Sequence, residues 1–281
     1  MINLHFLNYH HNGDIHYSKE FMRDLYEIIS PNKCFLHLKC NPNIVKDLKF
    51  LTIEPPVQFY DHSTIQTGDV EDVYITTWVG RFFRDVGSQY GASLSSNYLG
   101  FKQIYEQLGI EQHLKPINHY LPSVDFDCVE KTNIDSFFSK INNKVVFISN
   151  GDVWSGQSEN FDFNDIINCL PDNVVYILSH DKGLRKPNVF YTSDIIKING
   201  CDLLEISYLS TKCNVIVGRA SGPVCFCHIK DNYKDKNKVL IAISNTEYEG
   251  NWHHLVKNGA KQVWTNNYTI QNIVDTIKQN I

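Results

Sequence analysis

Five short apolar runs in the second half of the chain constrain the fold more than any other feature of the sequence. They are KVVFIS (144–149), NVVYILS (173–179), SDIIKI (193–198), NVIVG (214–218) and KVLIAIS (238–244). Because these runs are continuous rather than alternating, they are typical of parallel strands buried on both faces. Helix-like segments separate them: FNDIINCL (163–170), DLLEISYLSTK (202–212) and a segment that begins at Ser221. The pattern predicts an α/β domain with a parallel sheet.

The first half alternates in the same way. Strands are expected over 2–8, 34–38 and 72–78, and helices over 18–29 and 97–109. A chain of 281 residues has room for two domains, and the polar segment 128–143 separates the two sets of strands. We predict two Rossmann-like domains, 1–135 and 136–281, with parallel sheets that face each other across a cleft. The amphipathic segment 269–280 should form a last helix, which could pack back on the first domain.

Composition excludes several classes of function. The net charge of −5, without a run of Lys or Arg, argues against nucleic acid as a partner. No apolar run is long enough to span a bilayer, whereas peripheral contact with a membrane stays open. The first eleven residues are typical of a buried strand rather than an export signal, so we expect a cytoplasmic location. Neither a GxGxxG fingerprint nor a P-loop occurs, which argues against dinucleotide oxidoreductases and P-loop NTPases.

The cysteines indicate neither disulfides nor a metal site. Most of the eight stand singly, and several lie in apolar stretches where a thiol acts as a small hydrophobic group. Cys225, Cys227 and His228 are close in sequence, but a structural zinc site needs four ligands and nothing nearby completes the set. We therefore predict reduced thiols, no metal and no cofactor.

In parallel sheets, ligands bind beyond the carboxyl ends of the strands, and the first such turn carries an acid. The segment HHNGD (10–14) follows the first expected strand, and a helix is expected from Tyr17 or Ser18. Gly13 would allow a sharp turn, and Asp14 would then project at the rim of the cleft as a general base. Alternatively, Asp14 caps the helix. His16 could assist Asp14, although a lone histidine is more often structural.

The second turn is GRASGPVCFCH (218–228), where small residues would let a ligand approach the backbone. Ser221 and Gly222 open an expected helix whose free amides suit a phosphate, and Arg219 could add a charge. The alternative is a tight turn whose small residues serve helix–strand packing. An arginine here could equally be paired with a neighbouring surface residue.

Three further places could bind a phosphate-bearing ligand. The loop 149–161 offers Ser155, Gln157 and Ser158 as phosphate donors and Trp154 to cover a ring. In the loop 179–188, Lys182 could meet an anion, although solvated turn charge explains it as well. Glu205 could accept hydrogen bonds from a ribose, or it could simply be solvated.

The first domain offers further candidate binding residues. Trp78 could stack on a ring, and Arg81 could bind an acidic group. His11 and Gly13, in the first turn, belong to the same predicted site.

Two segments resemble a known family. NGDIHYS after the first strand is similar to the Gly-Asp turn of the lipopolysaccharide heptosyltransferases, glycosyltransferase family 9, and DLLEISYLSTKCNVIVGRASGP is similar to their donor-site helix, strand and Thr-Gly turn. The resemblance implies a GT-B glycosyltransferase with the acceptor on the first domain, a nucleotide sugar on the second and no obligatory metal. It makes Asp14 the base and places Ser221 and Gly222 at the phosphate.

The chain also departs from that family. Ala220 stands where the family has an aspartate, and Cys225 stands where it has a histidine. The usual lysine of the loop 149–161 has no counterpart, so ADP-heptose is not implied as the donor.

The function predicted from these residues is a hexosyl- or heptosyltransferase. It would move a sugar from a nucleotide sugar to a hydroxyl of a glycan or glycolipid, with Asp14 as base and without metal. Two alternatives stay open: a nucleotide-sugar 2-epimerase or hydrolase on the same fold, and a non-catalytic nucleotide- or sugar-binding remnant.

Overall fold

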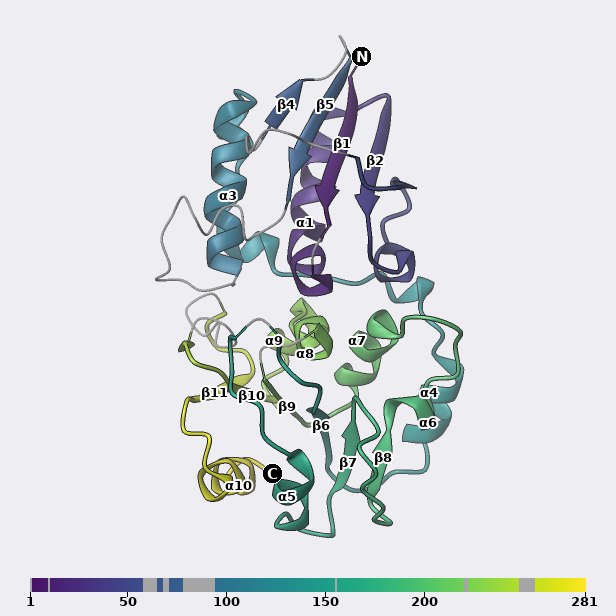
Figure 1. Ribbon diagram of the computed structural model, residues 1–281, viewed down its shortest axis with the longest axis vertical. Helices are drawn as coiled ribbons and strands as arrows, with labels where there is room; N and C mark the ends of the chain where they lie inside the picture. Colours follow the sequence, from purple (N-terminus) through teal and green to yellow (C-terminus); the bar gives the residue numbers. More distant parts are fainter. Residues whose placement is uncertain are drawn as a thin grey trace. The chain divides into compact units, whose positions relative to one another are not determined.

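The computed structural model describes residues 2–9, 11–57, 65–67, 71–77, 94–154, 156–219, 222–247 and 256–281. The chain divides into two compact units, Met1–Ser123 and Val124–Ile281. Each unit contains one sheet with helices packed on it (Figure 1).

The first unit has a five-stranded sheet in the order β3-β2-β1-β5-β4. Its pairs are parallel except for β4, which runs antiparallel to β5. The elements are β1 (Asn3–Asn8), α1 (Asn12–Ile29), β2 (Lys33–Leu38), β3 (Thr52–Glu54), β4 (Ile65–Thr67), β5 (Asp72–Thr76) and α3 (Leu94–Gln107).

Helices α1 and α3 pack side by side on one face of this sheet (Figure 1). The rings of Phe21 and Phe101 stack between them with centroids 4.0 Å apart. Helix α1 ends at Ile29, and the next residue, Ser30, is left-handed with φ of 49° and donates its N–H to the carbonyl of Tyr26. Pro31 follows and cannot continue the helix.

The second unit has a six-stranded sheet in the order β11-β10-β9-β6-β7-β8. All of its pairs are parallel. The strands are β6 (Val145–Ser149), β7 (Val175–Leu178), β8 (Val189–Tyr191), β9 (Val215–Arg219), β10 (Val239–Ile243) and β11 (Lys261–Thr265). The helices are α4 (Thr132–Phe138), α5 (Phe163–Asn168), α6 (Thr192–Ile195), α7 (Leu203–Thr211), α8 (Gly222–Cys227), α9 (Lys230–Lys234) and α10 (Ile270–Lys278).

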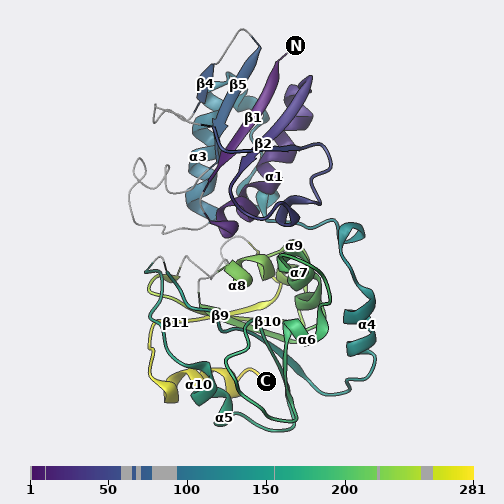
Figure 2. The ribbon, with the colours of Figure 1, turned by 45° about the vertical axis from the view of Figure 1, so that its right-hand side comes forward.

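Helices cover both faces of this second sheet, which is why its central strands are continuously apolar. On one face, α5 packs against α10, and Ile273, Val274 and Ile277 of α10 enter the core with Ile166 and Ile167 of α5. On the other face, α7 packs against α8 and α9 (Figure 2). We therefore assign α10, which the sequence allowed to pack on the first domain, to the second unit.

Several elements differ from their prediction. The apolar segment 193–198 was predicted as a strand, but the strand is β8, and α6 begins directly after it. The Asp194 carboxylate accepts a hydrogen bond from the N–H of Tyr191 at 2.9 Å, which caps this helix turn and ends the strand. Helix α1 begins at Asn12 rather than at Tyr17 or Ser18, so Asp14 is helical. Strands β3, β4 and β11 were not predicted.

The second unit also begins earlier in the sequence than the predicted boundary after residue 135. Helix α4 belongs to this unit because its residues contact α7 and β8. Tyr208 of α7 donates a hydrogen bond to Asp135 at 2.8 Å, and Phe137 meets the ring of Phe190 edge-on.

Candidate active site

Asp14 lies in the first turn of α1, directly after β1. The backbone N–H of Asp14 donates to the carbonyl of His11 at 3.1 Å, so the residue is inside the helix. One turn later, the hydroxyl of Ser18 donates to the carbonyl of Asp14 at 2.8 Å and lies 3.1 Å from the carbonyl of Thr77. Since Thr77 directly follows β5, these bonds hold the first turn of α1 at the carboxyl ends of β1 and β5.

The Asp14 side chain is buried without a partner among the described residues. It is 8% exposed, and no described residue forms a hydrogen bond or ion pair with its carboxylate. The N-cap residue of α1 is His11, so Asp14 does not cap this helix. Burial raises the pKa of Asp14 to about 7. A carboxylate with this pKa can accept a proton from a hydroxyl at neutral pH, as a general base does.

The other predicted residues of the first unit are placed as follows. Gly13 is a buried helical residue, so it does not form the sharp turn expected of it. His16 is fully buried on α1, where its ring packs beside Tyr17, and this position fits packing better than contact with a substrate. His11 is exposed. Trp78 and Arg81 lie outside the described residues.

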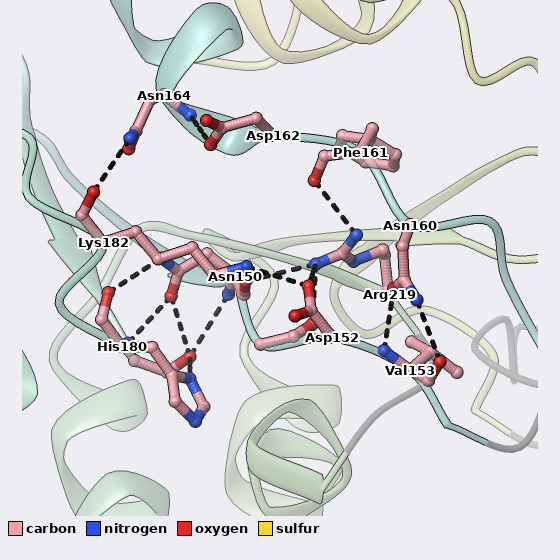
Figure 3. Close-up of polar contacts among 12 residues, drawn as sticks. Asn150, Asp152, Val153, Asn160, Phe161, Asp162, Asn164, His180, Lys182 and Arg219 are labelled. Carbon is pink, nitrogen blue, oxygen red and sulfur yellow. Dashed lines mark hydrogen bonds and ion pairs between the residues drawn. The ribbon is translucent and has the colours of Figure 1, made fainter.

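In the second unit, Asn150 joins the carboxyl ends of β6 and β7 (Figure 3). Its Oδ1 accepts the N–H of His180 at 2.8 Å, and its Nδ2 donates to the carbonyl of His180 at 2.8 Å. Gly151 follows, and a Cβ there would stand 2.7 Å from Cε1 of His180, so a larger residue would displace the exposed imidazole. The two strand ends are therefore fixed to each other.

Arg219 is the last residue of β9 and lies at the same carboxyl end of the sheet as Asn150 (Figure 3). Its guanidinium donates to three carbonyls, those of Phe161 at 3.1 Å, Asn150 at 3.1 Å and Gly151 at 2.7 Å. It also stacks on the rings of Phe161 and Phe163. The residue is 0% exposed. Of the two roles that the sequence suggested, the ion pair is present, with Asp152 at 3.5 Å. The three carbonyl bonds add a role that the sequence did not suggest, because they make Arg219 the group that holds both ends of the loop 150–161.

Lys182 is the predicted donor-site cation that stays exposed. Its Nζ donates to Oδ1 of Asp152 at 2.8 Å, and this hydrogen bond lowers the pKa of Asp152. Asp152 also lies 3.5 Å from Nη2 of Arg219. The ammonium of Lys182 is therefore positioned at the start of the loop 150–161, where an anionic ligand could compete for it.

The rest of the loop is held at several points. The side chain of Asn160 bonds both the N–H and the carbonyl of Val153, at 2.8 and 3.0 Å. Asn245 bonds the carbonyl of Gln157 through its N–H at 2.8 Å. Ser158 is buried, and Ser155 lies outside the described residues. Trp154 is 93% exposed, so it is free to cover a ring as the sequence suggested.

The remaining donor-site residues lie on α7 and α8. Glu205 is fully buried rather than solvated, and its Oε1 accepts the N–H of Glu130 at 3.5 Å. Gly222 is the first residue of α8, so a phosphate turn before this helix stays a proposal. Ser221 lies outside the described residues.

A hollow that sequence reasoning missed follows β8. It has a volume of about 550 Å³ and is lined by Ser193, Ile196, Lys197, Ile198, Asn199, Gly200 and Asp202. Gly200 has φ of 100°, which favours glycine, and burial raises the pKa of Asp202. Reading 193–198 as a strand concealed this hollow, although the Asn-Gly pair at 199–200 is a turn signal that could have revealed it.

Two further observations concern possible metal ligands and possible membrane-spanning helices. Among the described residues, no group of three or more His, Cys, Asp or Glu side chains is arranged to hold a metal ion. Cys227 and His228 are buried, and Cys225 is partly so. In the same part of the chain, every helix is too short or too polar to cross a bilayer.

Comparison with solved structures identifies the fold. A family 9 glycosyl transferase from Veillonella parvula DSM 2008 matches with a TM-score of 0.59 at 9% identity, over 100% of this chain and 90% of the other. The heptosyltransferase WaaC of E. coli, solved with ADP, matches at 0.53 and 9% identity over 100% of both chains. No protein-family model and no curated protein matches the sequence.

A third solved structure is described as iron-containing. The glycosyltransferase TibC from enterotoxigenic E. coli H10407, described as iron-containing and dodecameric, matches with a TM-score of 0.50 at 10% identity, over 95% of this chain and 63% of its own. Identities this low show the fold alone. The chain has the two-domain α/β fold of family 9 and other GT-B glycosyltransferases, and the resemblance predicted from its sequence is confirmed at the level of fold.

Proposed function

We propose that this chain, which has the fold of family 9 glycosyltransferases, is a glycosyltransferase of the hexosyl or heptosyl type. It moves a sugar from a nucleotide-sugar donor to a hydroxyl of a glycan or glycolipid acceptor. The observation that carries the proposal is Asp14, a buried carboxylate without a partner among the described residues, whose pKa is raised to about 7 at the carboxyl end of β1. A fold tolerates such a group where its basicity serves a reaction.

In the proposed reaction, the acceptor hydroxyl is the nucleophile and Asp14 is the base. The hydroxyl oxygen forms a bond to the anomeric carbon of the donor while the bond from that carbon to the diphosphate breaks. The hydroxyl proton passes to the Asp14 carboxylate, and the electron pair of the broken bond leaves with the nucleoside diphosphate. Charge therefore grows on the diphosphate in the transition state and needs stabilisation by fixed donors.

The donor-side residues are proposed from the second unit. Lys182 and the turn before α8, with Ser221 and Gly222, supply a cation and backbone donors for the diphosphate. The loop with Ser155, Gln157 and Ser158 covers it, and the 550 Å³ hollow after β8 holds the nucleobase between apolar Ile196 and polar Asp202. The stabilisation comes from these groups, and we propose that no metal takes part.

Nucleotide binding tests this proposal without knowledge of the acceptor. After treatment with EDTA, the protein should show a raised melting temperature with one of UDP, GDP, ADP or CMP, because a ligand that binds only the folded state stabilises it. At 100 times the dissociation constant, the gain is about 2.7 kcal/mol. The matching nucleotide sugar should then be cleaved in EDTA at a rate within about twofold of the untreated protein. The absence of a shift with all four nucleotides contradicts the donor site, and a shift that needs added metal contradicts only the metal-free mechanism.

A further inference from the structure

Asn8, the last residue of β1, is a buried polar residue beneath the first turn of α1. Its side chain is on the same face of the strand as Leu4 and Phe6, since successive strand residues alternate between faces. All three residues are buried, and Asn8 is 1% exposed. Its Nδ2 donates to the carbonyl of Thr77 at 3.4 Å and to Oγ1 of Thr77 at 3.2 Å.

These two bonds fix the orientation of the Asn8 amide. Oγ1 of Thr77 donates its own proton to the carbonyl of Leu7 at 3.3 Å, so it can only accept from Asn8. A flipped amide would place the Asn8 oxygen against two acceptors. The oxygen Oδ1 therefore occupies the other edge of the amide. It is buried and has no hydrogen-bond partner in the part of the chain that the structure describes, which is costly for a polar atom.

Asn8 and Asp14 belong to one group of contacts. The carbonyl of Thr77, which accepts from Asn8, is also 3.1 Å from the hydroxyl of Ser18. Ser18 and Asp14 are four residues apart and share a face of α1, and helical side chains lean toward the N-terminus of their helix. The first turn of α1, which carries Asp14, therefore lies at the end of β1 where Asn8 lies. The Asn8 amide oxygen can only accept hydrogen bonds, and so can the Asp14 carboxylate when it is ionised. Both groups therefore suit a ligand that has hydrogens to donate.

We propose that Asn8 determines acceptor specificity: its Oδ1 accepts a hydrogen bond from a second hydroxyl of the acceptor sugar while Asp14 deprotonates the first. This rests on the proposed transferase function and adds the class of acceptor. The sugar bears at least two free hydroxyls at the site. A phosphate or carboxylate in the place of the second hydroxyl has no hydrogen to donate and is disfavoured there.

The experiment compares three proteins: wild type, Asn8→Leu and Thr77→Val. Asn8→Leu keeps the approximate side-chain volume and removes Oδ1. Thr77→Val is the matched control because it removes the Oγ1 bond to Asn8 and leaves Oδ1 in place. Donors are UDP-glucose, ADP-glucose and GDP-mannose. Acceptors are the methyl glycosides of glucose, galactose and mannose, their monodeoxy analogues and methyl glucuronide. Nucleoside diphosphate release is measured with and without acceptor.

The wild type should use a neutral glycoside and lose about tenfold in kcat/KM when one particular hydroxyl is removed, since the buried oxygen then stays unpaired. Asn8→Leu should lose about tenfold on the complete glycoside and no longer distinguish it from that deoxy analogue. Thr77→Val should keep the discrimination. If Asn8→Leu fails to fold, the deoxy series with wild type still tests the prediction.

The outcomes separate this inference from the proposed function. Equal use of all monodeoxy analogues by the wild type, preference for the glucuronide, or unchanged discrimination in Asn8→Leu overturns the role of Asn8 while transfer itself stands. Donor cleavage without transfer to any neutral glycoside also overturns it. No cleavage of any donor, with or without acceptor, contradicts the transferase function and this inference with it.

Discussion

Replacing Asp14 with asparagine is expected to remove nearly all turnover. Asparagine has almost the same shape but cannot accept a proton, so the acceptor hydroxyl must attack without a base. General-base catalysis contributes a factor of about 100 to 10,000, and kcat should fall by that amount. Nucleotide affinity should be unchanged, because the proposed donor site is on the second unit. Steady-state release of nucleoside diphosphate and nucleotide titration measure the two quantities.

The same substitution is expected to stabilise the folded protein. The pKa of Asp14 is about 7 in the folded state, and the reference value for an exposed aspartate is about 3.9. Below about pH 4, Asp14 is neutral in the folded and the unfolded state, so it does not change the free energy of unfolding relative to a neutral side chain. Between about pH 4 and pH 7 the unfolded state ionises more readily than the folded state, so Asp14 lowers the free energy of unfolding increasingly as the pH rises. The asparagine side chain does not ionise, so Asp14→Asn should gain up to about 4 kcal/mol above pH 8 and almost nothing near pH 4.

Asp24, on the same helix, is a matched control, because we expect its replacement by asparagine to have the opposite effect on stability. It is also buried, but Lys115, Tyr105 and Tyr120 donate hydrogen bonds to it. Although burial alone would raise its pKa, these bonds lower it. Asp24→Asn should therefore lose roughly 3 kcal/mol at neutral pH, a loss that shrinks as the pH falls below about 4. Urea denaturation of both variants at pH 4, 6 and 8 measures the trends. Destabilisation of Asp14→Asn at pH 8 contradicts our account of Asp14.

Replacing Arg219 with methionine is expected to be the most damaging change in the second unit. Methionine fills part of the space but donates no hydrogen bonds, so the carbonyls of Asn150, Gly151 and Phe161 lose this donor. Each lost charged hydrogen bond at a buried acceptor costs about 1–3 kcal/mol, and we expect a total of about 3–5 kcal/mol. Nucleotide affinity should fall as well, because the loop 150–161 loses the group that joins its ends.

Lys182→Met separates loop structure from contact with the ligand. Lys182 is exposed, and its ion pair with Asp152 adds little to stability. This variant should keep the stability of wild type within about 0.5 kcal/mol and still bind nucleotide about tenfold more weakly. Thermal unfolding and nucleotide titration of both variants distinguish the two roles. Arg219→Met with wild-type stability contradicts the structural role of Arg219.

The architecture of the second unit was predictable from the sequence because it depends on burial. VVFIS, VYIL, VIVGR and VLIAI are strands β6, β7, β9 and β10, as their continuous apolar runs indicated. Chain length and the polar segment 128–143 predicted two such domains, and the resemblance to family 9 added the GT-B assignment. Element ends were less predictable, because they depend on single hydrogen bonds such as the one from Tyr191 to Asp194, which hydrophobic periodicity does not contain.

The candidate site was predictable in its location and less so in the roles of its residues. Asp14, Arg219 and Lys182 all lie at or just beyond carboxyl ends of strands, where chain order alone placed them. Sequence could not show that Arg219 is fully buried under the loop 150–161, because its three carbonyl partners are about 60 residues or more away in the chain. Nor could it show that the Asn8 amide is fixed by Thr77.

Titration of Asp14 in the free protein tests the central claim most directly. Protein labelled with ¹³C at the aspartate Cγ gives one carboxyl signal for each aspartate, and the Asp14 signal is the one that Asp14→Asn lacks. A buried carboxylate without a partner should titrate with a midpoint near pH 7, in parallel with the rising limb of kcat/KM. A midpoint near 4 would contradict the account, because Asp14 would then be an ordinary solvated or hydrogen-bonded acid.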